Sequence, residues 1–307
     1  MNPMIPHPAP SAMPGNGKYR VVIDTDTYNE IDDQFAVVQA LLSPDRLTVE
    51  ALFAAPFCNE RAATPGEGMQ LSYEEILRLL ARLHRSPDNL VYRGVTDYVT
   101  EKKIPRDAEA VQKLIQLARS ASPAAPLYVI AIAAISNVAS ALLQAPDIRH
   151  NIVVIWLGGN ALDWPDPWEF NLSQDIGGAQ VLLESRVRLV LLPCKGVVTH
   201  LRATLPEIER YVEPHGEIGA FLASRFRQYH HDHCGWSKEI WDMAAVGWLL
   251  HPDAMLNQAI PAPWLDNQGA WHTAPDRHPV TYVRFVERNI ILRDFFTRLA
   301  AWAAQQG

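Results

Sequence analysis

The sequence predicts an α/β fold, namely an open, mostly parallel, Rossmann-like sheet with helices on both faces and a helical C-terminal part. Short apolar runs rich in β-branched residues alternate with longer segments whose apolar residues recur at helical spacing. Strands that alternate with helices in this way pair in parallel through right-handed crossovers. No linker or internal repeat interrupts the pattern, so we expect one domain over residues 19–307.

The first predicted strand and helix bring acidic residues together. The β-branched run 21–23 forms a strand that ends at Asp24 and Asp26, and Asp32 and Asp33 open the helix that follows. In open α/β sheets, ligands bind at the carboxyl ends of the strands. We therefore expect these carboxylates to form part of a functional site.

The remaining elements follow in chain order. Residues 57–71 form a long loop, after which Ser72 and Glu75 match a capping box and predict a helix start at Ser72. We expect further strands at residues 47–55, 89–93, 126–133, 151–157, 188–192 and 254–260. We expect further helices at residues 106–119 and 136–143, through most of 206–253, and at 288–304.

Composition limits the class of protein. The chain has 307 residues, of which 48% are hydrophobic, and its net charge of -7 argues against a nucleic-acid partner bound by a basic face. Three scattered cysteines do not make a disulfide framework and fit a reducing cytoplasm. No apolar run is long enough to cross a membrane. Residues 1–18 lack the features of a signal peptide, and we expect them to be disordered.

The carboxylates at residues 24, 26, 32 and 33 point to a cation. Two carboxylates about 4 Å apart repel each other by roughly 4 kcal/mol at an effective dielectric constant of about 20. Few Lys or Arg residues are near them in the sequence. Oxygen ligands alone favour Ca²⁺ or Mg²⁺. The alternative is that Asp32 and Asp33 only complement the positive end of a helix.

Two later segments are further candidates. Glu169 and Asn171 are separated by one residue, so in an extended segment they point the same way and suit two neighbouring hydroxyls of a sugar. Asp242, after Trp241, opens an apolar helical run. The alternatives are an ordinary polar loop for the first segment and a helix cap for Asp242.

The stretch His230, His231, His233 and Cys234 offers possible zinc ligands. Adjacent histidines on a regular element cannot all face one ion, so a polar loop is the alternative. The sequence has no GxSxG, P-loop or GxGxxG motif, which argues against acyl transfer and dinucleotide chemistry.

Taken together, the motifs resemble the nucleoside hydrolase family, in particular the inosine-uridine preferring ribohydrolases. The resemblance covers residues 19–305 and rests on motif order and spacing. Its motifs are Asp24-Thr25-Asp26, Asp32-Asp33, residues 135–139, Gly158-Gly159, Glu169-Phe170-Asn171 and Asp242.

The resemblance implies Ca²⁺-dependent hydrolysis of the N-glycosidic bond of ribonucleosides, as in purine and pyrimidine salvage, by a homodimer or homotetramer. It implies that Asp26, Asp33 and Asp242 give carboxylates to the ion and that Ser136 gives its backbone carbonyl. Asp26 is then the general base that activates the attacking water. A bound Ca²⁺ lowers the pKa of that water, and the carboxylates favour a positively charged sugar in the transition state.

The resemblance also implies contacts to a small-molecule nucleoside. Asp32, Asn171 and Asp242 hold the 2′- and 3′-hydroxyls, and Glu169 reaches the 5′-hydroxyl. Other residues assigned to this site are Asn160, Trp241 and His233 as substrate contacts, and Asp24 behind the ligands.

The chain departs from the family pattern near the ion and near the base. Residues 27–31, between Asp26 and Asp32, form a connection two residues longer than the usual one. Trp241 stands where many members have a histidine that protonates the leaving base, which makes the histidines at 230, 231 and 233 the nearest candidates in sequence for that role.

Two alternatives remain open. One is a phosphohydrolase of the haloacid dehalogenase type, because Asp24-Thr25-Asp26-Thr27 also matches DxDxT after a strand, with Lys195 as its lysine. The other is a catalytically silent nucleoside- or sugar-binding homologue.

Overall fold

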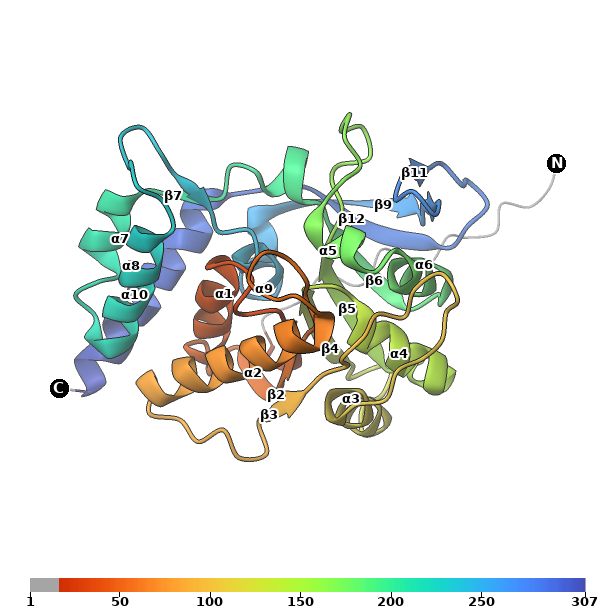
Figure 1. Cartoon of the computed structure of the whole chain (residues 1–307), viewed down its shortest axis with the longest axis horizontal. Coiled ribbons are helices and arrows are strands. Elements are labelled where there is room, and N and C mark those ends of the chain that lie inside the picture. The colour runs from red at the N-terminus through yellow and green to blue at the C-terminus, as the bar shows by residue number, and fades with distance from the viewer. Residues whose placement is uncertain (1–16, 307) are drawn as a thin grey trace.

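A computed structural model describes residues 17–306 (Figure 1). The expectation of a disordered N-terminal segment therefore falls almost wholly outside the described residues. The strands of the main sheet are β1 (Tyr19–Thr25), β2 (Leu47–Ala54), β3 (Val91–Arg93), β4 (Leu127–Ile132), β5 (Ile152–Leu157), β6 (Arg188–Leu192), β9 (Met255–Pro261) and β12 (Pro279–Val286). The short strands are β7 (Arg202–Ala203), β8 (Lys238–Glu239), β10 (Trp264–Leu265) and β11 (Trp271–His272).

Within residues 17–306, the main sheet has the order β3-β2-β1-β4-β5-β6-β12-β9. Neighbouring strands pair in parallel, except that β9 runs antiparallel to β12 at one edge. The predicted fold class is confirmed. The chain winds from β1 toward β3 and then returns to place β4 on the other side of β1. The sheet therefore has its topological switch point between β1 and β4, where α/β proteins bind ligands.

Helices cover both faces of the sheet (Figure 1). They are α1 (Asp32–Leu41), α2 (Pro65–Arg82), α3 (Glu109–Arg119), α4 (Ser136–Gln144), α5 (Phe170–Gln174), α6 (Ile176–Glu184), α7 (Leu205–Tyr211), α8 (Gly216–Gln228), α9 (Met243–Leu250) and α10 (Arg288–Gln306). One buried cluster joins α1, α2 and α7 to α10, and a second joins α3, α4 and α6. The two clusters form the hydrophobic cores on the two faces of the sheet.

Strand β1 shows why the sheet is apolar on both faces. Its side chains alternate between the faces, so Val21 and Ile23 join one buried cluster and Val22 joins the other. All three are fully buried. A run of β-branched residues without polar alternation is what a central parallel strand requires. The apolar run ends where the chain reaches the carboxyl edge of the sheet, and the aspartates begin there.

The predicted start of α2 is wrong. The helix begins at Pro65, and Thr64 caps it by accepting a 3.2 Å hydrogen bond from the Glu67 backbone N–H. Proline at the first helical position has the backbone angle that a helix needs, and threonine is a favoured cap. Ser72 is instead buried inside the helix, and Glu75 accepts a hydrogen bond from Gln34 Nε2 at 2.8 Å. The connection before α2 is correspondingly shorter than expected.

The C-terminal part contains one main-sheet strand that we do not predict from the sequence. The helical stretch between residues 205 and 250 and helix α10 agree with expectation, as does β9. Strand β12, however, inserts between β6 and β9 and makes β9 the antiparallel edge. Among the described residues, no helix combines the length and apolar character needed to cross a bilayer.

Candidate active site

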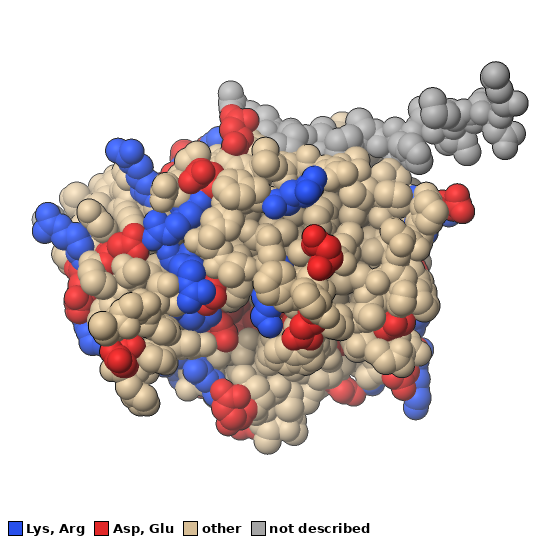
Figure 2. All heavy atoms as spheres, turned by 90° about the horizontal axis from the view of Figure 1, so that it is seen from above, with Lys and Arg blue, Asp and Glu red and all other residues tan. Residues whose placement is uncertain are grey.

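A cavity of about 550 Å³ opens at the carboxyl ends of β1, β4, β5 and β6. Figure 2 views the molecule from above and shows acidic atoms set back in a hollow of this surface, with Lys and Arg atoms at its margin. Residues from segments far apart in the sequence line the cavity: Asp26, Asn29, Glu30, Asp32, Asp33, Cys58, Asn59, Glu60, Arg61, Ile132, Leu157, Asn160, Trp168, Glu169, Phe170, Asn171, Gln174, Cys194, Lys195, Tyr229, Trp241 and Asp242.

Four carboxylates form the floor of this cavity. Asp26 follows β1, Asp32 and Asp33 form the first turn of α1, and Asp242 precedes α9. None is more than 3% exposed. One oxygen from each of Asp32, Asp33 and Asp242 lies within 4.8 Å of the others, so these three side chains can hold one metal ion.

Burial and mutual repulsion make these carboxylates hard to ionise together. Burial, and then the charge of Asp32, raise the pKa of Asp33 to about 8. Burial also raises the pKa of Asp32 itself to about 6, although the Lys238 ammonium opposes the shift. The pKa values of Asp26 and Asp242 lie well above the ordinary range, first because of burial and then because of the neighbouring carboxylates.

The chemistry of the donor set fits a divalent cation. Oδ2 of Asp26 is buried and has no hydrogen-bond partner among residues 17–306. A buried oxygen without a partner is costly, and a cation that binds the ionised forms removes that cost together with the repulsion. All candidate ligands are oxygens, which suits a hard ion such as Ca²⁺ or Mg²⁺.

Asp24 lies behind this floor. Its Oδ1 accepts a 2.7 Å hydrogen bond from Asn137 Nδ2, and its Oδ2 has no partner among the described residues. Burial raises the pKa of Asp24 to about 7, and the Asn137 hydrogen bond opposes the shift. Asp24 is not among the residues that line the cavity. Its position agrees with a supporting role behind the acidic floor.

The β5 side of the cavity carries Glu169 and Asn171. Glu169 caps the short helix α5, and its carboxylate accepts the backbone N–H groups of Gly159, Asn171 and Leu172 at 2.7 to 2.9 Å. Asn171 Nδ2 donates to the Leu157 carbonyl at 3.1 Å. The two side chains are thus fixed by the backbone and present their remaining polar capacity to the cavity.

A glycine makes this arrangement possible. Gly159 has φ of +74°, which favours glycine, and a Cβ there would lie 2.5 Å from the Trp271 ring. Trp271 therefore packs directly on the turn whose N–H binds Glu169. Asn160, the next residue, lines the cavity, but its amide is largely used to hold the surrounding loop, by donating to the Asp166 and Trp168 carbonyls at 2.9 Å.

The family model for "Inosine-uridine preferring nucleoside hydrolase" matches residues 21–288. The chain belongs to this family. It is 26% identical over 265 residues to the pyrimidine-specific ribonucleoside hydrolase RihA of Klebsiella pneumoniae (strain 342), and the match covers 76% of this chain and 80% of that protein. The assignment makes the chain a hydrolase of the nucleoside hydrolase class and replaces the phosphohydrolase interpretation.

Solved structures show the same fold. The purine-preferring ribonucleoside hydrolase from Gardnerella vaginalis superposes with a TM-score of 0.71 at 19% identity, covering 92% of this chain and 99% of that one. An inosine-guanosine nucleoside hydrolase gives a TM-score of 0.72 at 16% identity, covering 92% of this chain and 98% of that one. The names of these relatives differ in the base they state, so they set no base preference for this chain.

In this nucleoside hydrolase, Ser136 does not line the cavity. It is the first residue of α4, and its Oγ donates a 2.5 Å hydrogen bond to Asp175 Oδ2. Ile132, the last residue of β4, lines the cavity instead. The sequence motif around Ser136 therefore brings the end of β4 to the site, while the serine side chain fastens α4 to Asp175.

Trp241 and His233, which the resemblance places near the nucleobase, differ in position. Trp241 lines the cavity and also packs against the larger hydrophobic core. His233 does not line it, and its Nε2 lies 3.1 Å from the Arg227 carbonyl. No histidine is among the residues that line the cavity in the described part of the chain. The histidine stretch also forms no metal-binding group within residues 17–306.

The sequence does not predict that Glu30, Tyr229 and Lys238 belong to the site. Glu30 lines the cavity and accepts hydrogen bonds from Tyr229 and from Lys238, which lies 208 positions away. Glu30 lies two residues before the aspartate pair, which is a weak sequence signal for a role at the site. Nothing in the sequence indicates that residues so far apart meet there.

Proposed function

We propose that the chain catalyses the Ca²⁺-dependent hydrolysis of the N-glycosidic bond of ribonucleosides to free base and ribose. The observation that carries this proposal is the buried carboxylate floor, in one cavity with Glu169 and Asn171. Asp26 Oδ2 on this floor has no hydrogen-bond partner in the described part of the chain. The floor suits a cation and a developing positive charge, and the neighbouring side chains suit sugar hydroxyls.

Asp33 and Asp242 would hold the ion, and both belong to the three-carboxylate group that also contains Asp32. The family resemblance adds Asp26, which lies outside that group, as a further carboxylate ligand. A bound Ca²⁺ would lower the pKa of the attacking water and orient it. Since Ile132 lines the cavity and Ser136 does not, we propose the backbone at the end of β4 as the carbonyl ligand. Thr25 Oγ1 donates a 2.5 Å hydrogen bond to Asp33 Oδ1, which fixes that carboxylate from behind.

Asp26 would act as the general base. Its Oδ2 has no competing donor among the described residues, so it can take the proton of the attacking water. Loss of the base leaves positive charge on the sugar, and the carboxylates of Asp32 and Asp242 beneath it stabilise that charge. This stabilisation acts in the transition state and therefore raises kcat.

The sugar hydroxyls would be held from two sides. Asp32, Asn171 and Asp242 would contact the 2′- and 3′-hydroxyls, and Glu169 the 5′-hydroxyl. Glu169 Oε1 accepts one backbone N–H, from Asn171, so it retains capacity for another donor. Asn160 would support this wall mainly through the loop that it fastens.

A product assay tests the proposal. Purified protein is incubated with a panel of purine and pyrimidine ribonucleosides in Ca²⁺, and free ribose and free base are measured, with Asp26→Asn as control and p-nitrophenyl phosphate as counter-substrate. We expect ribose and base in equal amounts, with loss in the variant. Saturable nucleoside binding without products would instead indicate a catalytically silent nucleoside-binding homologue. Phosphate release from p-nitrophenyl phosphate would support a phosphohydrolase.

A further inference from the structure

Glu30 is held in the cavity by two donors. Lys238 Nζ lies 2.6 Å from Glu30 Oε2, and the Tyr229 hydroxyl donates to Oε1 at 2.9 Å. The Lys238 side chain is 7% exposed and that of Glu30 is 37% exposed. The ammonium is therefore enclosed, whereas part of the carboxylate faces the cavity that it lines.

This network presents hydrogen-bond acceptors. A carboxylate paired with an ammonium accepts only, and each of its oxygens keeps a free lone pair after one bond. Tyr229 has a single hydroxyl proton, and it donates that proton to Glu30. Tyr229 lines the cavity, and its phenolic oxygen can therefore only accept a further hydrogen bond. Two cationic residues line the cavity within residues 17–306. Arg61 is exposed and donates to the Tyr28 carbonyl at 3.3 Å, and Lys195 follows β6.

The position of the network indicates which part of a substrate it meets. Glu169 and Asn171 follow β5, and Glu30 follows β1. Strand β4 lies between β1 and β5, so these strands are roughly 10 Å apart at the usual strand spacing. In the proposed function the 5′-hydroxyl lies at Glu169 on the β5 side, and the anomeric carbon lies over the carboxylate floor. The leaving group then faces the remaining lining segments, which include Glu30, Tyr229 and Trp241.

We infer that Glu30, with Tyr229, is a specificity-determining contact that selects nucleosides whose leaving base carries an exocyclic amino group. The inference rests on the proposed function, because it takes the leaving group to be a nucleobase. An amino group offers two N–H donors to the two acceptors. An oxo group at the same ring position presents lone pairs to the carboxylate, and this contact is repulsive.

The extended connection between Asp26 and Asp32 supplies this group. Asn29 is buried, and its Oδ1 accepts a 2.8 Å hydrogen bond from Asn59 Nδ2. The loop is thereby tied to the segment after β2, and Glu30 is tied to β8 and the end of α8. Glu30 is thus fixed at both sides, as a group that discriminates between substrates must be.

The experiment compares matched substrate pairs. Adenosine and inosine, and likewise cytidine and uridine, differ in an amino group replaced by an oxo group and in the adjacent ring nitrogen, which is an acceptor in the amino member and an N–H donor in the oxo member. We measure kcat/KM for all four with the wild-type holoenzyme and with Glu30→Gln, whose amide can both donate and accept. We expect the wild type to favour the amino member of each pair roughly tenfold, and the variant to reduce that preference to within about threefold.

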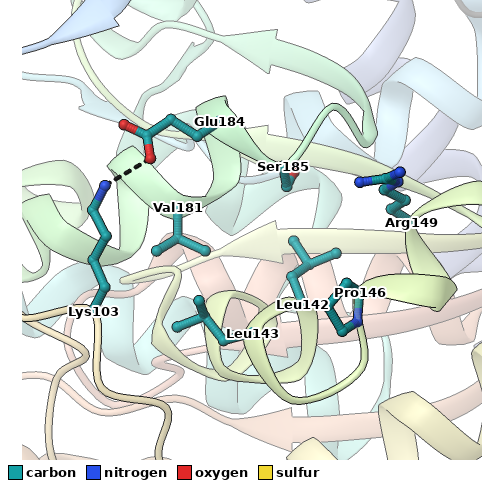
Figure 3. A pocket seen from close by; sticks show the side chains of 8 residues that line it. All are labelled: Lys103, Leu142, Leu143, Pro146, Arg149, Val181, Glu184 and Ser185. Atoms are coloured by element: carbon teal, nitrogen blue, oxygen red, sulfur yellow. Dashed lines mark hydrogen bonds and ion pairs between the residues drawn. The ribbon is translucent and has the colours of Figure 1, made fainter.

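Two further variants separate specificity from stability. Glu30→Gln leaves the enclosed Lys238 ammonium without its partner, so the double variant Glu30→Gln/Lys238→Met removes that charge as well, and we expect it to show the same reduced preference. Glu184→Gln is the matched control, because Glu184 also pairs with a lysine, Lys103 Nζ at 2.6 Å, in a separate cavity of about 190 Å³ (Figure 3). We expect this control to keep the wild-type preference.

The outcomes distinguish the two proposals. Hydrolysis of all four nucleosides with no preference for the amino members, or equal losses on both members of a pair in both Glu30 variants, would overturn the inference and leave the proposed function intact. Failure of the wild type to release ribose from any of the four would overturn the proposed function and the inference with it.

Discussion

Asn137 Nδ2 donates a 2.7 Å hydrogen bond to Asp24 Oδ1, and Asn137 Oδ1 accepts one of 2.8 Å from the Val95 backbone N–H. A single buried amide therefore joins the end of β1, the start of α4 and the segment after β3. These three places border the switch point of the sheet, where the carboxylate floor lies. Asn137 thus supports the site without lining the cavity.

Replacing Asn137 with leucine should lower the free energy of unfolding by about 3 kcal/mol, because it leaves a buried carboxyl and a buried N–H unsatisfied. Urea denaturation measures this loss as a lower midpoint with an unchanged slope. The exposed Asn289→Leu is the control and should stay within about 0.5 kcal/mol of the wild type. A midpoint equal to that of the control would show that the Asn137 amide contributes little.

Much of this architecture can be predicted from the sequence because its signals are local. The strand that ends at Asp24 is an uninterrupted apolar run, and the aspartate pair begins a helix whose apolar residues recur at helical spacing, so both parts of the floor can be inferred before their contact is known. Strand β12 carries a local signal that the sequence predictions miss, because Pro279–Val286 is rich in β-branched and aromatic residues. Its place in the sheet has no local signal. It pairs with β6 in parallel and with β9 in antiparallel fashion, and that placement depends on contacts between distant segments.

Contacts at the site are equally hard to read from the sequence. The motif at Ser136 marks the end of β4, but the sequence does not show that the Ser136 hydroxyl binds Asp175, 39 residues later, and the role of its backbone carbonyl stays a prediction. Similarly, the histidine stretch is conspicuous in sequence, yet its side chains lie outside the cavity. Glu30 is inconspicuous because its partners, Tyr229 and Lys238, come from another part of the chain.

Chelated protein should lose stability as the pH rises from about 4 to about 8. Burial and repulsion raise the pKa of Asp33 to about 8 and that of Asp32 to about 6, whereas in the unfolded chain an aspartate titrates near 3.9. Between these values the folded protein holds protons that the unfolded chain has released, so the free energy of unfolding falls with increasing pH. Scanning calorimetry of chelated protein at several pH values measures this trend.

Added Ca²⁺ should reverse the trend, because it favours the ionised carboxylates. At a hundred times its Kd, a ligand stabilises the folded state by about 2.7 kcal/mol, which corresponds to roughly 5 °C in Tm for a protein of this size. We expect the Ca²⁺-induced rise in Tm to be larger at pH 8 than at pH 5.5, where protons compete. Equal rises at both pH values, or the same rise in Asp33→Asn, would count against ion binding at this cluster.

Mutations of metal ligands and of sugar contacts should have different effects on Ca²⁺ binding and on kcat/KM. Asp33→Ala or Asp242→Ala should abolish Ca²⁺ binding measured by calorimetry, since each removes a carboxylate from the cluster. Asn171→Ala should bind Ca²⁺ normally and lose about 2 to 4 kcal/mol in kcat/KM, as expected for removal of one preorganised hydrogen-bonding group. If Asn171→Ala bound Ca²⁺ and kept full activity, the assignment of Asn171 as a sugar contact would be wrong.

The loop histidines should be dispensable for leaving-group protonation. His230, His231 and His233 do not line the cavity, and an acid must lie within hydrogen-bond reach of the atom that it protonates. Single alanine substitutions should therefore leave kcat/KM within about twofold of the wild type, both for natural nucleosides and for p-nitrophenyl riboside, whose leaving group needs no proton. A large loss confined to the natural nucleosides would restore a histidine to that role.

Trp241 should act by stacking rather than by proton transfer. Its indole N–H is only a weak donor, so it cannot replace the histidine that many family members have at this position. It lines the cavity beside Asp242, and stacking of a base on an aromatic side chain contributes roughly 1 to 3 kcal/mol, with a pyrimidine offering less surface than a purine.

Trp241→Ala should therefore cost more in kcat/KM on purine nucleosides than on pyrimidine nucleosides, by roughly tenfold for the larger ring. Because Trp241 also packs against the hydrophobic core, Tm is measured in parallel, and Trp241→Phe serves as the conservative control that keeps an aromatic face. We expect the phenylalanine variant to recover most of the purine selectivity. Equal losses of kcat/KM on both classes of nucleoside, or a lower Tm with unchanged selectivity, would show that Trp241 is a packing residue. Other residues of the cavity would then contact the nucleobase.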